Sequence, residues 1–338
     1  MPVYKTLQRQ QEAINFTPNS SGSAKLQRNY NYSYIIFELV VNYKAQTGAT
    51  FKYLNFANLI KNFQIFANGS TEFKNLNFAQ LVYQTYIYTR GKLFYDIPQL
   101  PAKDATQALT ATHTLRVIVP FASLLMTKPS DTGLQSNQFQ TLDYLINWND
   151  ASAVGTGIEI ISAQLKPTSF EKIETLAKGE QVNNMKLVQK LQSEQITTTT
   201  TGYLINLPAQ KQYQYFQFDL QTGSTGDAAP NTIKNIKFLN GTDVIVQLSI
   251  DTLKAMNRLR YGIDDNAFKS IYSAYITTNQ VLNPDAHFVL DFSDRGHYSN
   301  SWDIKDFKAP QIALDTDLSS LNNASLNVNI AMSYAEAN

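Results

Sequence analysis

The sequence predicts an all-β protein that contains two copies of one domain. The main observation is an internal repeat, because residues 60–70 return as residues 233–242 with one residue dropped. The match continues in register, since the offset is 173 at its start (233 − 60) and 171 at the later pair Gly91 and Gly262 (262 − 91). A period of about half of the 338 residues indicates two domains rather than a solenoid of short repeats.

The composition supports a β-rich protein with much of its surface covered by neighbouring molecules. Charged residues make up 16% of the chain, whereas soluble domains usually have about 25%. The net charge of +1 does not favour nucleic-acid binding, and the absence of cysteine excludes disulfides, thiolate nucleophiles and thiolate metal ligands. We find neither an apolar leader nor an apolar run long enough for a membrane span, so we expect a soluble chain made in the cytoplasm.

Residues 1–29 are expected to form a polar, flexible N-terminal arm. The arm carries four basic residues against Glu12, a local net charge of +3 (4 − 1). One interpretation is a frayed, solvated terminus. The other is a segment that contacts a neighbouring molecule or an anionic membrane surface. For that second interpretation the candidate contact residues are Lys5, Leu7, Arg9, Lys25 and Arg28.

The first domain is expected at residues 30–166. The apolar, β-branched run at residues 34–41 predicts a strand that is buried on both faces. A further strand leads into Asn68-Gly69, a dipeptide that favours a hairpin turn, and Asn77 then caps a helix. Later strands of this domain are predicted at residues 115–119, 144–148 and 157–163.

A helical connector is expected at residues 167–196, because Thr168 and Glu171 have the spacing of a capping box that precedes an apolar helical stripe. The second domain is then expected at residues 197–338. It begins with a strand-like threonine run and repeats the hairpin at Asn240-Gly241 and the helix start at Ser249. Its later strands are predicted at residues 287–292 and 326–332.

The sequence contains little that indicates catalysis. His113 and His287 occupy equivalent places in the repeat, and one such histidine per domain is too few for a metal site, so a structural role is favoured. Residues 293–297 hold the residue types of a catalytic triad but have the composition of a surface loop. Residues 264–266 are explained by helix capping, with a calcium site as the alternative. We therefore predict that the protein is not an enzyme and has no cofactor and no metal.

The two halves resemble the double jelly-roll major capsid proteins of icosahedral viruses with an internal membrane. The hairpins at Asn68-Gly69 and Asn240-Gly241 and the helix starts at Asn77 and Ser249 carry this resemblance. The asparagine- and lysine-rich composition is most like that of the lipid-containing bacteriophages of Flavobacterium. The resemblance implies two tandem eight-stranded jelly rolls, with short inserted helices and the helical connector between them.

The same resemblance implies a structural role in the virion. Three chains would form a pseudo-hexagonal capsomer, which would contact neighbouring capsomers, minor capsid proteins and vertex proteins. The N-terminal arm would contact the internal membrane or a neighbouring capsomer, and no specific nucleic acid would be bound. Because polar termini contribute little to a folded core, we expect removal of the arm to leave the folded trimer intact but to prevent the assembly of particles. The alternatives are a secreted two-sandwich glycan amidase or hydrolase, which would need paired acidic residues in a cleft, and a carbohydrate-binding adhesin.

Overall fold

The computed structural model describes residues 3–51, 53–89, 94–96, 108–121, 133–175, 185–223, 229–261, 286–292, 302–303, 307–321 and 325–337. Strands dominate this part of the chain, and it contains two α-helices. The chain divides into two compact units. The first is formed mainly by residues 1–188, and the second by residues 189–265 and 282–336. The all-β prediction is therefore confirmed.

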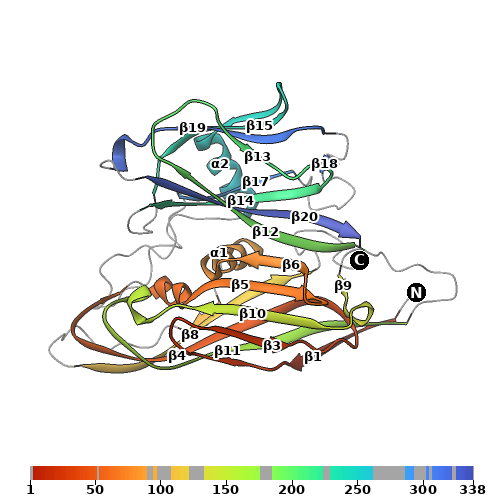
Figure 1. Cartoon of the computed structure of the whole chain (residues 1–338), viewed down its shortest axis with the longest axis vertical. Coiled ribbons are helices and arrows are strands. Elements are labelled where there is room, and N and C mark those ends of the chain that lie inside the picture. The colour runs from red at the N-terminus through yellow and green to blue at the C-terminus, as the bar shows by residue number, and fades with distance from the viewer. Residues whose placement is uncertain are drawn as a thin grey trace. The chain divides into compact units, whose positions relative to one another are not determined.

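The first unit consists of two layers of antiparallel strands (Figure 1). One layer has the strand order β1 (Val3–Gln10), β11 (Gly155–Thr175), β4 (Asn31–Phe51), β8 (Leu109–Pro120) and β7 (Phe94–Asp96), with β2 (Ile14–Asn15) and β9 (Leu134–Gln135) paired at its sides. The other layer has the order β3 (Ser21–Lys25), β10 (Leu142–Trp148), β5 (Ile60–Ala67) and β6 (Thr71–Leu76).

The second unit repeats this arrangement. One set of strands has the order β12 (Met185–Ile196), β20 (Leu326–Ala337), β14 (Gln212–Thr222) and β17 (His287–Asp291), with β18 (Trp302–Asp303) paired to β14. The other has the order β13 (Tyr203–Asn206), β19 (Pro310–Thr316), β15 (Ile233–Asn240) and β16 (Asp243–Ser249). Each strand of the series β1-β11-β4-β8 and β3-β10-β5-β6 thus has a counterpart, so both units contain the predicted eight strands.

The two hairpins that carry the sequence repeat are present but differ in detail. In the first, Asn68 and Gly69 have φ values of 52° and 74°, as a tight turn between β5 and β6 requires. In the second, Asn240 still belongs to β15, and Gly241 has the positive φ, at 61°. The residue that is missing from the second copy of the repeat therefore changes the turn but not the pairing of the two strands.

The core of the first unit lies between its two layers. Along β4, Phe37, Leu39 and Val41 are fully buried, while the alternate residues are half-buried. The expectation of a strand buried on both faces is therefore wrong, and β4 has the alternation of a strand with one core face. Phe37 crosses the core to Phe63 on β5, with their ring centroids 4.8 Å apart in an edge-to-face contact.

The predicted flexible arm at residues 1–29 is part of the first unit. Strand β1 pairs with β11 from Val3 to Gln10, and β3 pairs with β10. Between these strands Ile14 is buried, and so is Leu26 after β3. The prediction failed because β1 is a polar edge strand, in which exposed Thr6 and Gln8 alternate with half-buried neighbours, and this pattern resembles a solvated terminus.

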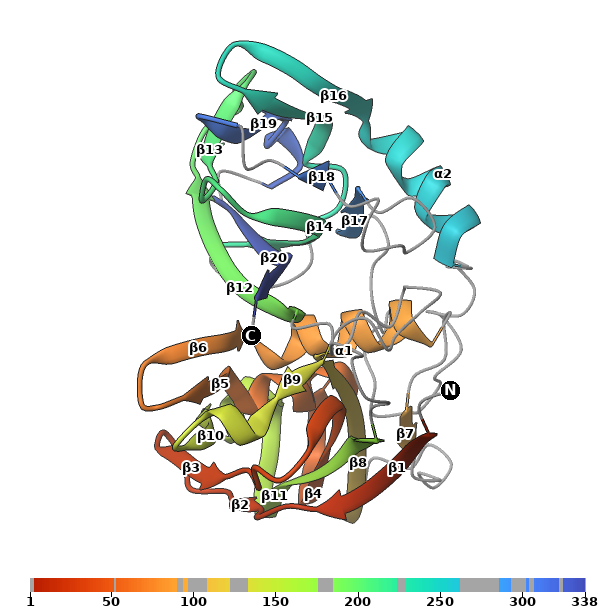
Figure 2. The same ribbon diagram turned by 90° about the vertical axis from the view of Figure 1, so that its right-hand side faces the viewer.

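The helical connector predicted at residues 167–196 is also wrong. Strand β11 runs to Thr175 and β12 begins at Met185, while residues 176–184 lie outside the described part. Ser169 and Glu171 are both buried on one face of β11, so the apparent capping box is a strand with two inward polar residues. The threonine run at residues 197–201 is not a strand either. The counterpart of β1 is β12 (Figure 2). The first strand therefore begins 27 residues before the predicted start of the first domain (30 − 3), and β12 begins 12 residues before that of the second (197 − 185).

Candidate assembly surface

Each unit carries one helix directly after the equivalent hairpin. In the first unit Asn77 caps α1 (Phe78–Tyr88), since its side chain accepts from the Gln80 backbone N–H at 2.8 Å and the Gln80 side chain accepts from the Asn77 N–H. In the second unit the Ser249 hydroxyl accepts from the Thr252 backbone N–H at 3.2 Å, at the start of α2 (Ile250–Tyr261). Both helix starts were predicted from the sequence.

The two helices differ in their exposure. Nine of the 11 residues of α1 are buried, and the Thr85 hydroxyl accepts a hydrogen bond from the Ile118 backbone N–H of β8. In α2 five of 12 residues are buried. Leu259 is 90% exposed and Met256 is 46% exposed. An apolar helix face that is left open in this way is typical of a contact surface.

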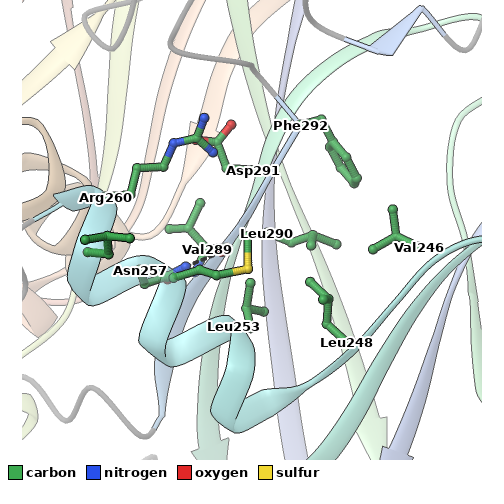
Figure 3. A pocket seen from close by; sticks show the side chains of 11 residues that line it. Val246, Leu248, Leu253, Asn257, Arg260, Val289, Leu290, Asp291 and Phe292 are labelled. Atoms are coloured by element: carbon green, nitrogen blue, oxygen red, sulfur yellow. Dashed lines mark hydrogen bonds and ion pairs between the residues drawn. The ribbon is translucent and has the colours of Figure 1, made fainter.

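An apolar groove of about 610 Å³ runs beside α2 in the second unit. Figure 3 shows side chains of α2 and β17 converging on it. Eleven residues line this groove: Val246, Leu248, Leu253, Met256, Asn257, Leu259, Arg260, Val289, Leu290, Asp291 and Phe292. We call this lining the α2 groove. Sequence reasoning missed it, although the apolar residues at positions 256 and 259 of a short amphipathic helix were a usable signal.

Polar groups fix the helix at one end of the α2 groove. Arg260 Nη1 lies 3.0 Å from Asp291 Oδ2, and the Tyr261 hydroxyl donates to the same carboxylate. Burial, together with the Asp291 charge, raises the pKa of Tyr261 well above its usual value. Asn257 forms two hydrogen bonds with the Val289 backbone, at 2.8 and 2.7 Å, which attach α2 to β17. The groove therefore has a fixed wall and an apolar floor.

Strand β16 forms the outer rim of the α2 groove. It is hydrogen-bonded to β15 and stands last in the strand order of its sheet, so one edge has no strand beside it among the described residues. Its side chains are exposed or half-buried, and Val244 is 54% exposed. An apolar, β-branched edge strand of this kind is prone to pair with another chain.

Of the five contact residues predicted in the arm, three lie on β1, Lys25 lies at the end of β3, and Arg28 follows it. Arg9 pairs with Glu171 and Arg28 donates to the Phe139 carbonyl, so both are engaged within the first unit. Lys25 is exposed on β3 and Leu7 is half-buried on β1. The backbone of Lys5 lies in β1, but its side chain is outside the description.

The two equivalent histidines have different surroundings. His113 on β8 is buried with its ring 4.6 Å from that of Phe56. His287 on β17 lies opposite Asp219 on β14, with Nδ1 3.3 Å from Oδ1. Burial raises the pKa of Asp219 to about 7 and lowers the pKa of His287 to about 3.

No group of three or more histidine, aspartate or glutamate residues with metal-binding geometry occurs in the described part of the chain. Residues 264–266 and 293–297, which the sequence analysis singled out, lie outside the described residues. Within the same described ranges, no helix has the length and hydrophobicity needed to cross a lipid bilayer.

Comparison with known proteins identifies the class of fold. No protein-family model and no curated protein sequence matches the chain. Solved structures match along its whole length. The major capsid protein of Sulfolobus turreted icosahedral virus has a TM-score of 0.68 at 15% identity, covering 99% of this chain and 96% of that one. The major capsid protein P2 of bacteriophage PM2 has a TM-score of 0.58 at 12% identity, covering 100% and 98%. The Faustovirus major capsid protein has a TM-score of 0.58 at 8% identity, covering 99% and 90%.

These likenesses define the class of fold. The chain has the double jelly-roll fold of viral major capsid proteins, as the sequence predicted. The particular likeness to phages of Flavobacterium is not among these findings and stays a prediction.

Proposed function

We propose that the protein is a major capsid protein that forms homotrimeric, pseudo-hexagonal capsomers of an icosahedral virion. The single observation that supports this most is the pairing of a double jelly-roll fold with an open apolar surface on the second unit. Three copies of a chain with two similar units generate approximate sixfold contacts from a true threefold axis. The α2 groove, with Leu259 90% exposed beside it, is the surface that such an assembly would cover.

The groove does not favour the hydrolase alternative. Of its eleven lining residues, Asp291 is the one carboxylate, and this carboxylate is engaged by Arg260 and Tyr261. A glycan hydrolase needs a pair of carboxylates across its cleft. We therefore propose a structural rather than an enzymatic role.

The remaining partners stay predictions, namely the internal membrane and the minor capsid and vertex proteins. Synthesis in a host cytoplasm also stays a prediction. The contact of the arm with a membrane is weakened as a proposal because Arg9 and Arg28 are engaged within the first unit. Exposed Lys25 is the residue of that set best placed to meet an anionic surface.

Electron microscopy of the purified native protein tests the proposal. A capsid protein of this class gives compact trimers whose averaged images have a pseudo-hexagonal outline. Images of single two-lobed monomers at micromolar concentration would contradict the proposed capsomer and would favour the adhesin alternative.

A further inference from the structure

Strands β1 and β12 are equivalent in position and in sequence. Each lies beside the final strand of its unit, β11 or β20. Residues 5–11 read Lys-Thr-Leu-Gln-Arg-Gln-Gln and residues 186–192 read Lys-Leu-Val-Gln-Lys-Leu-Gln, so lysine, glutamine, a basic residue and a second glutamine recur at the same spacing. Lys5 therefore corresponds to Lys186, and Leu7 to Val188.

The first residues of β12 cover the free edge of β6 within the first unit. These residues, up to Val188, cluster with that unit, and β12 follows β6 in the hydrogen-bonded strand order. Lys74 Nζ of β6 donates to the Leu187 carbonyl at 2.9 Å, and Lys186 Nζ lies 5.6 Å from the centroid of the Phe73 ring. Leu187 and Val188 are fully buried. The outer edge of the first hairpin is thus closed by residues 186–188, which cluster with the same unit.

The equivalent edge in the second unit is open. Strand β16 corresponds to β6, with Ile245 in the place of Phe73 and Val246 in the place of Lys74 (245 − 73 = 246 − 74 = 172, the offset at the helix starts). Among the described residues no strand lies beside the outer edge of β16, and none lies beside the outer edge of β1. By the repeat, the segment that should cover β16 is the counterpart of β12, which is β1.

We propose that β1 of a neighbouring copy pairs with the open edge of β16 and covers the mouth of the α2 groove, in the way that β12 covers β6. This inference rests on the proposed cyclic trimer and names the segment and the surface that join its copies. The contact is heterologous, since each copy offers β1 on one unit and β16 on the other. Such contacts close into a ring when the rotation between copies is a whole fraction of a turn, as in the proposed trimer.

The chemistry of the two surfaces agrees with this pairing. Leu7 of β1 is half-buried and apolar, and most residues that line the groove are apolar as well. Unpaired backbone donors and acceptors of two edge strands are satisfied when the strands pair. The eleven groove residues are about half of the roughly 20–30 residues per side of a stable interface, so the strand pairing extends the contact toward the usual size.

Site-specific crosslinking tests the proposal, because the chain has no cysteine of its own. The full-length double variant Lys5→Cys with Ile245→Cys would be treated, as native protein, with a short bis-maleimide. The repeat places Lys5 next to Ile245, as Lys186 lies over Phe73. We expect crosslinking between copies that yields covalent trimers on a denaturing gel.

The matched control pairs Lys5→Cys with Leu204→Cys, since Leu204 is 53% exposed on β13, at the opposite edge of the same sheet. This control should yield few covalent trimers. If the native mass is trimeric but both variants crosslink equally, or if the first crosslinks only within one chain, the proposed contact is wrong while the capsomer stands. A monomeric native mass would instead overturn the proposed function together with the contact.

Discussion

Arg9 and Glu171 form an ion pair that joins β1 to β11, with Nη2 3.6 Å from Oε2. The Glu171 side chain is fully buried and that of Arg9 is 21% exposed. The Ser169 hydroxyl donates to Glu171 Oε1 at 2.6 Å, and the Gln11 side chain donates to Ser169 at 2.8 Å. The N-terminal segment is therefore attached to the first unit by a buried polar network as well as by backbone pairing.

Replacing Glu171 by alanine should destabilise the first unit by about 3 kcal/mol, because it leaves Arg9 without its buried carboxylate. Denaturant unfolding would measure the loss. The control is Glu38→Ala, which breaks the ion pair between Glu38 and Arg116. The Glu38 side chain is 30% exposed and that of Arg116 is 34% exposed. That change should cost about 1 kcal/mol or less. Equal effects of the two substitutions would show that the Arg9–Glu171 pair is not a special attachment.

A truncated chain that begins at Asn29 should be less stable than the full chain. It loses β1 and β3, and with them the pairing to β11 and β10. Because 1 kcal/mol corresponds to roughly 2–4 °C for a domain of this size, we expect the first melting transition to fall by about 10 °C or more. An unchanged transition would restore the expectation of a dispensable arm.

Asp219 and His287 should make opposite contributions to the pH dependence of stability. The pKa of Asp219 is raised from 3.8 to about 7, so its contribution is greatest at low pH and is lost as the pH rises between these values. The pKa of His287 is lowered from 6.5 to about 3, so its contribution is present above pH 6.5 and is lost as the pH falls toward 3. Each slope is about 1.4 kcal/mol per pH unit.

These two slopes cancel in the native chain between about pH 4 and 6.5, so its melting temperature should be nearly flat there. In Asp219→Asn the stability should rise with pH across this range, because the histidine acts alone. In His287→Gln it should fall. Thermal unfolding of the three proteins at several pH values would measure this, and parallel pH profiles would contradict the assignment of buried titrating groups.

Val244→Lys should weaken the assembly without lowering the stability of the second unit. Val244 is 54% exposed on the open edge of β16, and a charge on an edge strand discourages pairing with another chain. Leu204→Lys is the matched control, at 53% exposure on β13. Sedimentation at several concentrations should show a trimer that dissociates at least tenfold more readily for Val244→Lys alone. Equal dissociation of both variants would move the interface elsewhere.

The sequence predicted those elements whose signals are local. The hairpins and the two helix starts at Asn77 and Ser249 depend on turn and capping chemistry within a few residues, and the structure confirms them. The buried strands of the first unit were likewise visible in apolar runs. The internal repeat predicted the two-unit architecture, because the same pattern occurs in both halves of the chain.

The failures have a common physical cause. Strands β1 and β12 are polar. Ser169 and Glu171 are polar residues that are buried, because their partners Arg9 and Gln11 come from the N-terminal segment, about 160 residues earlier in the sequence. A capping box and a strand with two inward polar residues can have the same sequence pattern, and they are told apart only when the partner strand is known. The α2 groove depends in the same way on β17, which is brought to the helix by tertiary pairing.

The mass of the native protein in solution tests the central claim most directly. Each chain has a mass of 38.0 kDa, and light scattering coupled to size exclusion at micromolar concentration should give a value three times that of one chain. The same value should persist on dilution, as expected for a capsomer. A mass equal to that of a single chain at every concentration would contradict the account of this protein as a trimeric capsid component.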